Sequence, residues 1–309
     1  MAKKSAIAVN LEYGAIRTFS AIVNALPFRL AMAMAGALAF LAAKVFRFKR
    51  KRTFGRIRSV FPGISDKECA RIALKSLANV FKTAVEMMRA PGFDRKWMDR
   101  HIIEGEEYKR RLQSYVDEGK GVVIMVPHSG NWYMAAWSMA KYGLKLFAIA
   151  ARQRNKKIDA WMKRQYGDIE VLDRGSRKTL VDIKERLAAG GAFAILPDLR
   201  VKEPDVEVDF LGGKANVSHA GAMFALRSSS PIVVAAMRRE GLKHRFVHIA
   251  TLRPDPAAKD RKAEAERLTK EALRLLDEEI RANPGDWFWY NKRWILEPPK
   301  SFKPKESLA

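Results

Sequence analysis

The sequence predicts an α/β fold in which a mixed central sheet is flanked by helices and preceded by an apolar and basic helical segment. Short apolar runs typical of buried strands alternate with amphipathic stretches of ten to thirteen residues typical of helices. Of the 309 residues, 48% are hydrophobic and 30% are charged, a balance that favours a folded domain over a disordered chain. No internal repeat or low-complexity linker divides the sequence.

The predicted elements follow one another after residue 60. The first is a helix over 66–89, because apolar residues recur there at helical spacing, Ser65 can cap it, and Pro91 and Gly92 end it. Continuous apolar runs such as GVVIMV and AFAIL indicate strands covered on both faces. Strands are predicted at 121–126, 145–150, 169–172, 192–196, 231–237 and 245–250. Further helices are predicted at 106–118, 131–141, 156–165, 177–189, 218–227 and 260–281.

The charge of the chain is strongly basic and unevenly distributed. Lys and Arg number 58 against 34 Asp and Glu, which gives a formal charge of +24 with the five histidines neutral. Residues 1–60 hold twelve of the basic residues and one acid, Glu12. An anionic partner is therefore expected. The single cysteine, Cys69, excludes an intrachain disulfide, and no metal-ligand spacing or G-x-S-x-G elbow is present, so we expect neither a metal nor a bound cofactor.

An apolar stretch near the N-terminus is followed directly by a basic block. Residues 30–43 carry no charge and reach about 21 Å as a helix, short of the roughly 20 residues needed to span a bilayer. Residues 44–58 then carry eight positive charges and no acid, interleaved with aromatic residues. This pattern favours attachment to an anionic bilayer surface. A buried core helix and a nucleic-acid-binding block are the alternatives, and no nucleic-acid-binding motif supports the second.

These patterns divide the chain into three parts. Residues 1–60 form a membrane-associating helical and polybasic segment, residues 61–299 form the α/β domain, and residues 300–309 form a polar tail. The aromatic end of the domain, DWFWYNKRW at 286–294, suits either a membrane interface or packing on the core.

His128 is the leading candidate for a functional side chain. It follows the strand at 121–126 and Pro127, and residues 129–131 lead into the next helix. Ligands of open α/β sheets bind outside the carboxyl ends of the strands. A helix beginning at 129–131 also aims free N–H groups at this place, which suits an oxyanion or a phosphate.

The segment around His128 resembles a signature of the lipid A biosynthesis late acyltransferases and related glycolipid acyltransferases, in the lysophospholipid acyltransferase superfamily. That segment is PHSGNW at 127–132, similar to their His-Gly-Asn-Trp pattern. Other segments resemble further motifs of the family in the same order, over about residues 10–297: 97–107 (WMDRHIIEGEE), 149–167 (IAARQRNKKIDAWMKRQYG), 194–200 (AILPDLR), 208–215 (VDFLGGKA) and 286–294.

The resemblance implies transfer of a fatty acyl chain from an acyl carrier protein or coenzyme A thioester to a hydroxyl of a lipid A precursor or related glycolipid. It places the protein at the cytoplasmic face of the inner membrane. His128 is then the general base, Arg164 falls where the family carries a functional Arg, and Asp198 is expected at the same sheet edge as His128. The residues expected to bind the substrates are Gly130, Asn131, Arg152, Asn155, Arg174 and Arg200.

Tyr133 departs from the family pattern, in which an Asp or Glu five positions after the His orients the imidazole. A phenol can hydrogen-bond an imidazole but carries no negative charge at neutral pH. Three explanations follow: another carboxylate such as Asp198 orients His128, Tyr133 suffices at a lower rate, or the chain has lost the chemistry. If the pair is incomplete, Tyr133→Glu is expected to raise the rate of transfer.

Two other functions compete with the transferase interpretation. The first is a catalytically silent membrane protein that binds lipid in the same groove, which Tyr133 favours. The second is a nucleic-acid-binding protein, which only the charge favours.

Overall fold

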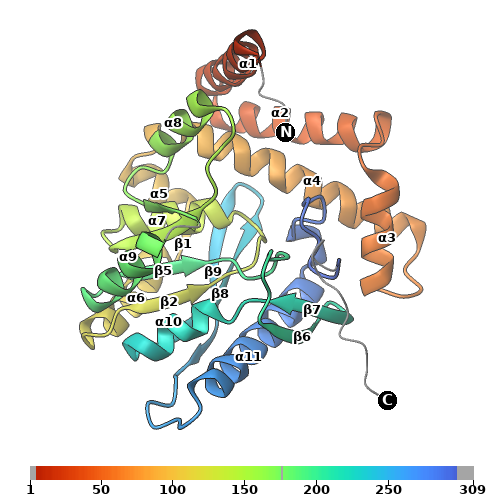
Figure 1. Ribbon diagram of the computed structural model, residues 1–309. Coiled ribbons are helices and arrows are strands. Elements are labelled where there is room, and N and C mark those ends of the chain that lie inside the picture. The colour runs from red at the N-terminus through yellow and green to blue at the C-terminus, as the bar shows by residue number, and fades with distance from the viewer. Residues whose placement is uncertain (1–4, 175–176, 298–309) are drawn as a thin grey trace.

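A seven-stranded sheet forms the centre of the protein, for which a computed structural model describes residues 5–174 and 177–297 (Figure 1). The predicted tail at 300–309 lies outside the described residues. In spatial order the strands are β1 (Ile102–Ile103), β9 (Lys243–Leu252), β8 (Ile232–Glu240), β2 (Val122–Met125), β5 (Ala192–Ile195), β3 (Leu146–Ala150) and β4 (Glu170–Asp173). Neighbouring strands are parallel except β8 and β9, which form an antiparallel hairpin. The predicted mixed sheet is confirmed.

Helices cover both faces of this sheet. One face packs against α6 (Gly105–Asp117) and α7 (Trp132–Lys141). The other packs against α9 (Arg177–Ala188), α10 (Ala220–Ser228) and α11 (Arg261–Ala282). Side chains of β2 alternate between two hydrophobic clusters on the two sides. The near-continuous apolar runs of the central strands follow from this double burial.

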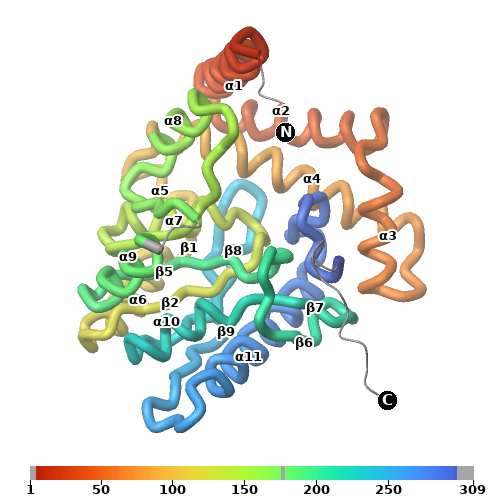
Figure 2. The backbone as a smooth tube through the Cα atoms, in the orientation of Figure 1, coloured from red at the N-terminus to blue at the C-terminus, as the bar shows by residue number. Residues whose placement is uncertain are grey.

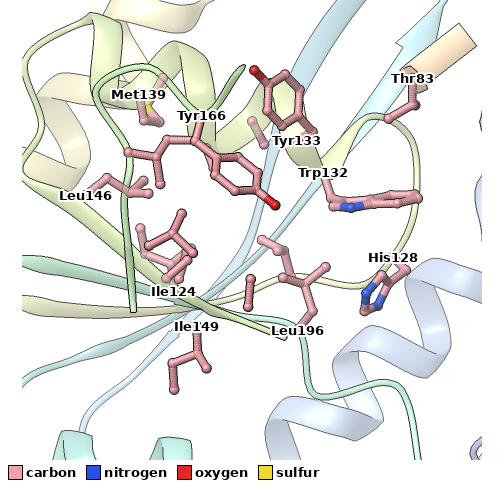
Figure 3. A pocket seen from close by; sticks show the side chains of 18 of the residues that line it. Thr83, Ile124, His128, Trp132, Tyr133, Met139, Leu146, Ile149, Tyr166 and Leu196 are labelled. Atoms are coloured by element: carbon pink, nitrogen blue, oxygen red, sulfur yellow. The ribbon is translucent and has the colours of Figure 1, made fainter. Parts of the chain in front are cut away.

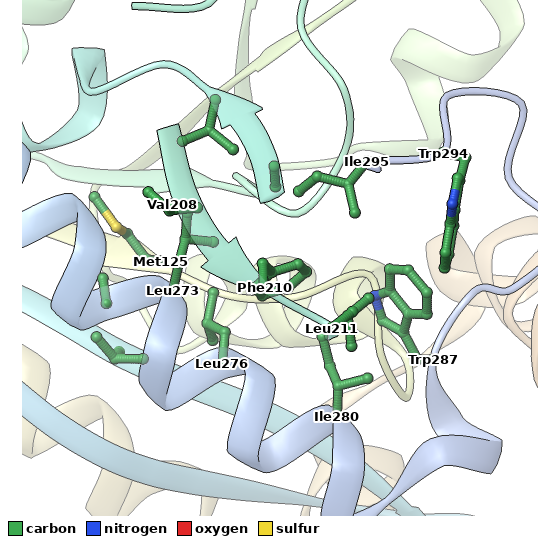
Figure 4. Packing of buried hydrophobic residues seen from close by; sticks show 14 of the residues in the cluster. Met125, Val208, Phe210, Leu211, Leu273, Leu276, Ile280, Trp287, Trp294 and Ile295 are labelled. Carbon is green, nitrogen blue, oxygen red and sulfur yellow. The ribbon is translucent and has the colours of Figure 1, made fainter. Parts of the chain in front are cut away.

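A two-stranded hairpin lies beside the main sheet. β6 (Val206–Phe210) and β7 (Gly213–Val217) pair antiparallel, and Val208 and Phe210 pack toward Leu273 and Leu276 of α11 (Figure 4). The sequence analysis assigns no strand here. The alternation of buried and exposed residues in β6 covers only five positions, which is a weaker signal than the apolar runs of the central strands.

The N-terminal helices form one end of the molecule (Figure 2). They are α1 (Ala6–Ala25), α2 (Phe28–Phe40) with the π-helical turn η1 (Leu41–Val45), α3 (Arg50–Val60), α4 (Asp66–Arg89), the 3₁₀ turn η2 (Ala90–Gly92) and α5 (Arg95–His101). α8 (Lys156–Gln165) contacts α1. The sequence analysis predicts α4 with the same bounds but leaves α1, α3 and α5 unassigned, because charges and small residues interrupt their apolar pattern.

Apart from Arg29, α2 consists of apolar residues, and its two sides have different surroundings. Ala31, Met32 and Ala35 are buried in a cluster that includes Val85 of α4. Leu30, Phe40 and Leu41 are exposed. Within the described residues, Phe28–Val45 is the one stretch long and apolar enough to cross a membrane. The helix therefore combines packing on the protein with an outward apolar side.

The C-terminal aromatic segment packs into the main core. It follows the 3₁₀ turn η3 (Pro284–Asp286), and Trp287, Trp289 and Trp294 are buried. Figure 4 shows Trp287 and Trp294 in this core. Arg56 of α3 donates hydrogen bonds to the carbonyl oxygens of Trp289 at 3.0 Å and Asn291 at 2.8 Å. Of the two possibilities for this segment, core packing is the one observed, and part of the basic block holds it in place.

Candidate active site

His128 and Asp198 lie side by side at the carboxyl edge of the sheet. β2 and β5 pair in parallel with Met125 opposite Ile195, and each site residue follows three positions after its member of that pair. Equal extensions of a parallel register end next to each other. The imidazole Nδ1 of His128 lies 2.7 Å from Oδ1 of Asp198.

The Asp198 carboxylate is fully buried and accepts three hydrogen bonds. Besides the imidazole N–H, it accepts the backbone N–H of His128 and the indole N–H of Trp287, each at 2.7 Å. Burial alone raises the pKa of this carboxyl, but the interaction with His128 and these hydrogen bonds outweigh burial and hold the pKa below its ordinary value. The ionised carboxylate keeps the proton of His128 on Nδ1 and leaves Nε2 with a free lone pair.

The turn that carries His128 is fixed by its backbone. The backbone carbonyl of His128 accepts the N–H of Phe288 at 3.0 Å, and the Gly130 N–H donates to the backbone carbonyl of Asp286 at 3.0 Å. Gly130 has a φ of +57°, and a Cβ there would lie 1.6 Å from the Met237 carbonyl oxygen, so only glycine fits.

The prediction of free N–H groups at 129–131 is wrong for Ser129 and Gly130. The amides of Ser129 and Gly130 are used by the carbonyls of Pro127 and Asp286, because the chain turns tightly against the C-terminal segment. α7 begins one residue later than 131, with Asn131 as its N-cap. Within the described part of the chain, the first-turn amides of Trp132 and Tyr133 have no hydrogen-bond partner, as expected at a helix start.

A cavity of about 470 Å³ opens beside His128 (Figure 3). Figure 3 shows Met139 and Leu146 on the opposite side of the cavity from His128. The lining side chains are largely apolar and come from α4, α6, α7, α8 and the sheet; they include Val80, Ala84, Met87, Leu112, Ile124, Met139, Leu146, Ile149, Met162, Leu196 and Phe246. Such a cavity can hold a long apolar group with its reactive end at the imidazole.

One known protein family matches nearly the whole chain. The family described as bacterial lipid A biosynthesis acyltransferase matches residues 4–295. The chain belongs to this family. It is also similar to the phosphatidylinositol mannoside acyltransferase of Mycolicibacterium smegmatis, with 23% identity over 286 residues, or 89% of each chain. The protein of the same name from Mycobacterium tuberculosis is 23% identical over 261 residues, which cover 81% of this chain and 78% of the relative. The protein is accordingly an acyltransferase.

Tyr133 of this acyltransferase belongs to the cavity wall and does not face His128. Its hydroxyl donates to the backbone carbonyl of Gln165 at the end of α8, and in Figure 3 it points away from the imidazole. Burial raises the pKa of this phenol, so it stays neutral. Among the three explanations for Tyr133, this geometry agrees with the first, in which Asp198 orients His128.

Two arginines line the cavity together with His128. Arg174 follows β4, and Arg293 comes from the C-terminal segment. Burial and the nearby charges of Arg174 and Arg200 lower the pKa of Arg293, while the backbone N–H of Arg200 donates to the Arg293 carbonyl at 3.2 Å. The sequence analysis singles out Arg174 and Arg200 but not Arg293 or Trp287. The available signal is the DWFWYNKRW motif, for which the sequence predicts either a membrane interface or core packing and assigns no site residue.

The other predicted site residues lie outside the cavity lining. Arg164 is on the exposed side of α8, whose cavity-facing residue is Met162. Arg152 pairs with Asp173 at 2.5 Å, and Asn155 caps α8 and donates to the carbonyl of Val9 at 2.8 Å.

Asn131 is fully buried, so its position gives no support to direct contact with substrate. Among residues 5–174 and 177–297, no group of three or more His, Cys, Asp or Glu side chains could hold a metal ion.

We predict that Tyr133→Glu does not raise the rate of acyl transfer. A carboxylate at this position would lie in an apolar wall opposite the Gln165 carbonyl, which costs more folding stability than the roughly 1–3 kcal/mol of an unsatisfied neutral group. Tyr133→Phe removes only the hydroxyl and should retain transfer within a few-fold of the wild-type rate. Steady-state transfer and urea unfolding of both variants test this, and a faster Tyr133→Glu enzyme would contradict it.

Proposed function

We propose that this acyltransferase moves a fatty acyl chain from an acyl carrier protein or coenzyme A thioester to a hydroxyl of a lipid A precursor or related glycolipid. The observation that carries the proposal is the His128–Asp198 pair at an apolar cavity. The cavity suits an acyl chain, and the pair suits removal of a hydroxyl proton. The family is named for lipid A and the relatives for a phosphatidylinositol mannoside, which supports a glycolipid acceptor.

His128 is the general base of the proposed reaction. Its Nε2 accepts the proton of the acceptor hydroxyl while the hydroxyl oxygen bonds to the thioester carbonyl carbon. Asp198 stabilises the imidazolium that forms. The tetrahedral intermediate then collapses, the carbon–sulfur bond breaks, and the imidazolium returns its proton to the thiolate. The products are an ester and a thiol, and the thioester is the only co-substrate.

The oxyanion of the intermediate requires hydrogen-bond donors near His128. The unpartnered first-turn amides of Trp132 and Tyr133 lie four and five positions after His128, and the start of a helix favours negative charge. Arg174 and Arg293 add positive charge at the same cavity and suit the phosphates of the donor or the acceptor.

The acceptor is a membrane lipid, so the proposal places the N-terminal helices on the inner membrane at its cytoplasmic face. α1, α2, η1 and the residue that follows η1 expose apolar side chains, among them Ile7, Leu11, Phe40 and Phe46. Exposed basic residues such as Lys44 and Lys51 adjoin them and suit anionic lipid. Partial burial of α2 against α4 favours a helix that lies in the interface over one that spans the bilayer. A nucleic acid has no part in this proposal.

Disruption of the His128–Asp198 pair should slow acyl transfer strongly. Asp198→Asn is expected to lower kcat by about 10²- to 10⁴-fold, because the proton of His128 is no longer fixed on Nδ1, and His128→Ala should lower it at least as far. The assay follows a labelled acyl group from acyl carrier protein and coenzyme A thioesters to a lipid A precursor and to a phosphatidylinositol mannoside.

The matched control for this assay is Asp209→Asn, which removes an exposed carboxylate bound to Lys214. It should transfer at the wild-type rate. Wild-type rates in Asp198→Asn would contradict the proposed base. Absence of transfer by the wild-type protein from every donor would favour a lipid-binding protein that retains the fold.

The membrane placement predicts a selective loss of vesicle binding. Phe40 and Phe46 are 51% and 76% exposed, and replacing both by Ser removes about 1.5–3 kcal/mol of apolar burial for each ring that inserts. Flotation with phosphatidylglycerol vesicles should fall at least tenfold. The control, Leu180→Ser with Val181→Ser, removes equally exposed apolar side chains from α9 and should float like the wild type. Equal flotation of both double variants would refute this placement.

A further inference from the structure

A second buried ionic cluster lies behind the turn that carries His128. The carboxylate of Glu86 on α4 accepts two hydrogen bonds from the Arg239 guanidinium, at 2.6 and 2.8 Å. It also accepts from the His244 imidazole at 2.9 Å and from the Asn131 amide at 2.6 Å. Burial alone raises the pKa of Glu86, but interactions with His244 and Arg239 hold the pKa far below its ordinary value, so the carboxylate is ionised.

Two hydrogen-bonded routes connect this cluster to the turn at 128–131. In the first, Asn131 donates to Glu86 with its amide nitrogen, while its amide oxygen caps α7 by accepting the Met134 N–H at 2.9 Å. In the second, Arg239 donates to the Asn79 amide oxygen at 2.7 Å, and Asn79 donates to the Gly130 carbonyl at 2.6 Å. The two routes end on Asn131 and Gly130, which are the third and second residues after His128.

The cluster is buried away from the substrates, and a buried ion pair is weak evidence of a role in stability alone. Glu86, His244 and Asn131 are all fully buried. Replacing a buried ion pair by apolar groups is often neutral for folding, because desolvation offsets the attraction between the charges. A positioning role accounts for these contacts, because the cluster is hydrogen-bonded to Gly130 and Asn131, two consecutive residues of one tight turn.

We propose that Glu86 is a positioning residue that fixes the turn at 128–131, through Asn131 directly and through Arg239 and Asn79 at Gly130. The imidazole of His128 is thereby held from two sides: Asp198 sets its tautomer and ring orientation, and Glu86 sets the backbone on which it stands. This inference rests on the proposed role of His128 as the base.

The neighbouring residue of β8 supplies a matched control. Arg238 donates to Glu279 of α11 at 2.6 and 2.9 Å, and Glu279 also accepts from the amide of Asn283 at 3.0 Å. The Glu279 cluster therefore shares the Arg–Glu pair and the Asn of the Glu86 cluster, which also includes His244, and Glu279 is buried as well. Its residues hold α11 and the start of the C-terminal segment instead of the turn.

The experiment compares three full-length variants with the wild type. Glu86→Met with Arg239→Met removes the ion pair without leaving an unpaired charge. Asn131→Ser breaks the tie to Glu86 but keeps an N-cap for α7, because serine caps helices as well as asparagine does. Glu279→Met with Arg238→Met is the control. The readouts are kcat and KM for acyl transfer, the urea unfolding midpoint, and amide hydrogen exchange of residues 127–134.

The first two variants should lose roughly 10²-fold in kcat, as expected for a displaced catalytic group, with a much smaller change in KM. Exchange at 127–134 should accelerate in both. The control should change the unfolding midpoint while kcat and exchange at 127–134 stay near wild type.

Wild-type kcat and wild-type exchange in Asn131→Ser would overturn the proposal, and this single variant decides the question if the Glu86/Arg239 variant does not fold. Hydrogen exchange needs no substrate. If the wild-type protein transfers no acyl group, the base assignment fails, and the exchange data still decide whether Glu86 holds the turn.

Discussion

The buried Asp198 carboxylate is the interaction on which the site depends. It accepts hydrogen bonds from the His128 backbone, the His128 ring and the Trp287 indole. Three segments therefore meet there: those that carry Asp198, His128 and Trp287. The parallel register of β2 and β5 brings the first two together. The third depends on the C-terminal segment, which Arg56 of α3 holds by its carbonyl oxygens. A basic helix near the N-terminus thus contributes to the order of the site.

The buried carboxylates near His128 lie apart from the apolar lining of the cavity. Buried carboxylates stand on two sides of the turn that carries His128, Asp198 at the ring and Glu86 behind the backbone, and each accepts hydrogen bonds from fixed donors. The cavity itself is largely apolar, with Arg174 and Arg293 among its few charged lining residues. A thioester with a long chain and an anionic carrier fits this division, because its tail and its phosphates require opposite surroundings.

Local sequence patterns predict most of the sheet, several helices and the proximity of His128 and Asp198. Periodicity gives α4 and α8 with the bounds observed, and the topology of parallel strands places Asp198 near His128. Contacts between distant segments have no local signal. Glu86 and Arg239 are 153 positions apart, and their pairing appears only once α4 lies against β8. The same limit applies to Tyr133, whose direction depends on where α8 ends, and to Arg293, whose role depends on the path of the C-terminal segment.

The most direct test of this account is the tautomer of His128, read from ¹⁵N chemical shifts of histidine-labelled protein in detergent at a pH where the ring is neutral. The account predicts a proton on Nδ1 and an unprotonated Nε2, because the ionised Asp198 accepts from Nδ1. It also predicts that Asp198→Asn loses this preference while the other histidine signals stay in place. A wild-type ring with its proton on Nε2 would contradict the central claim, since the nitrogen needed to accept the hydroxyl proton would already be occupied.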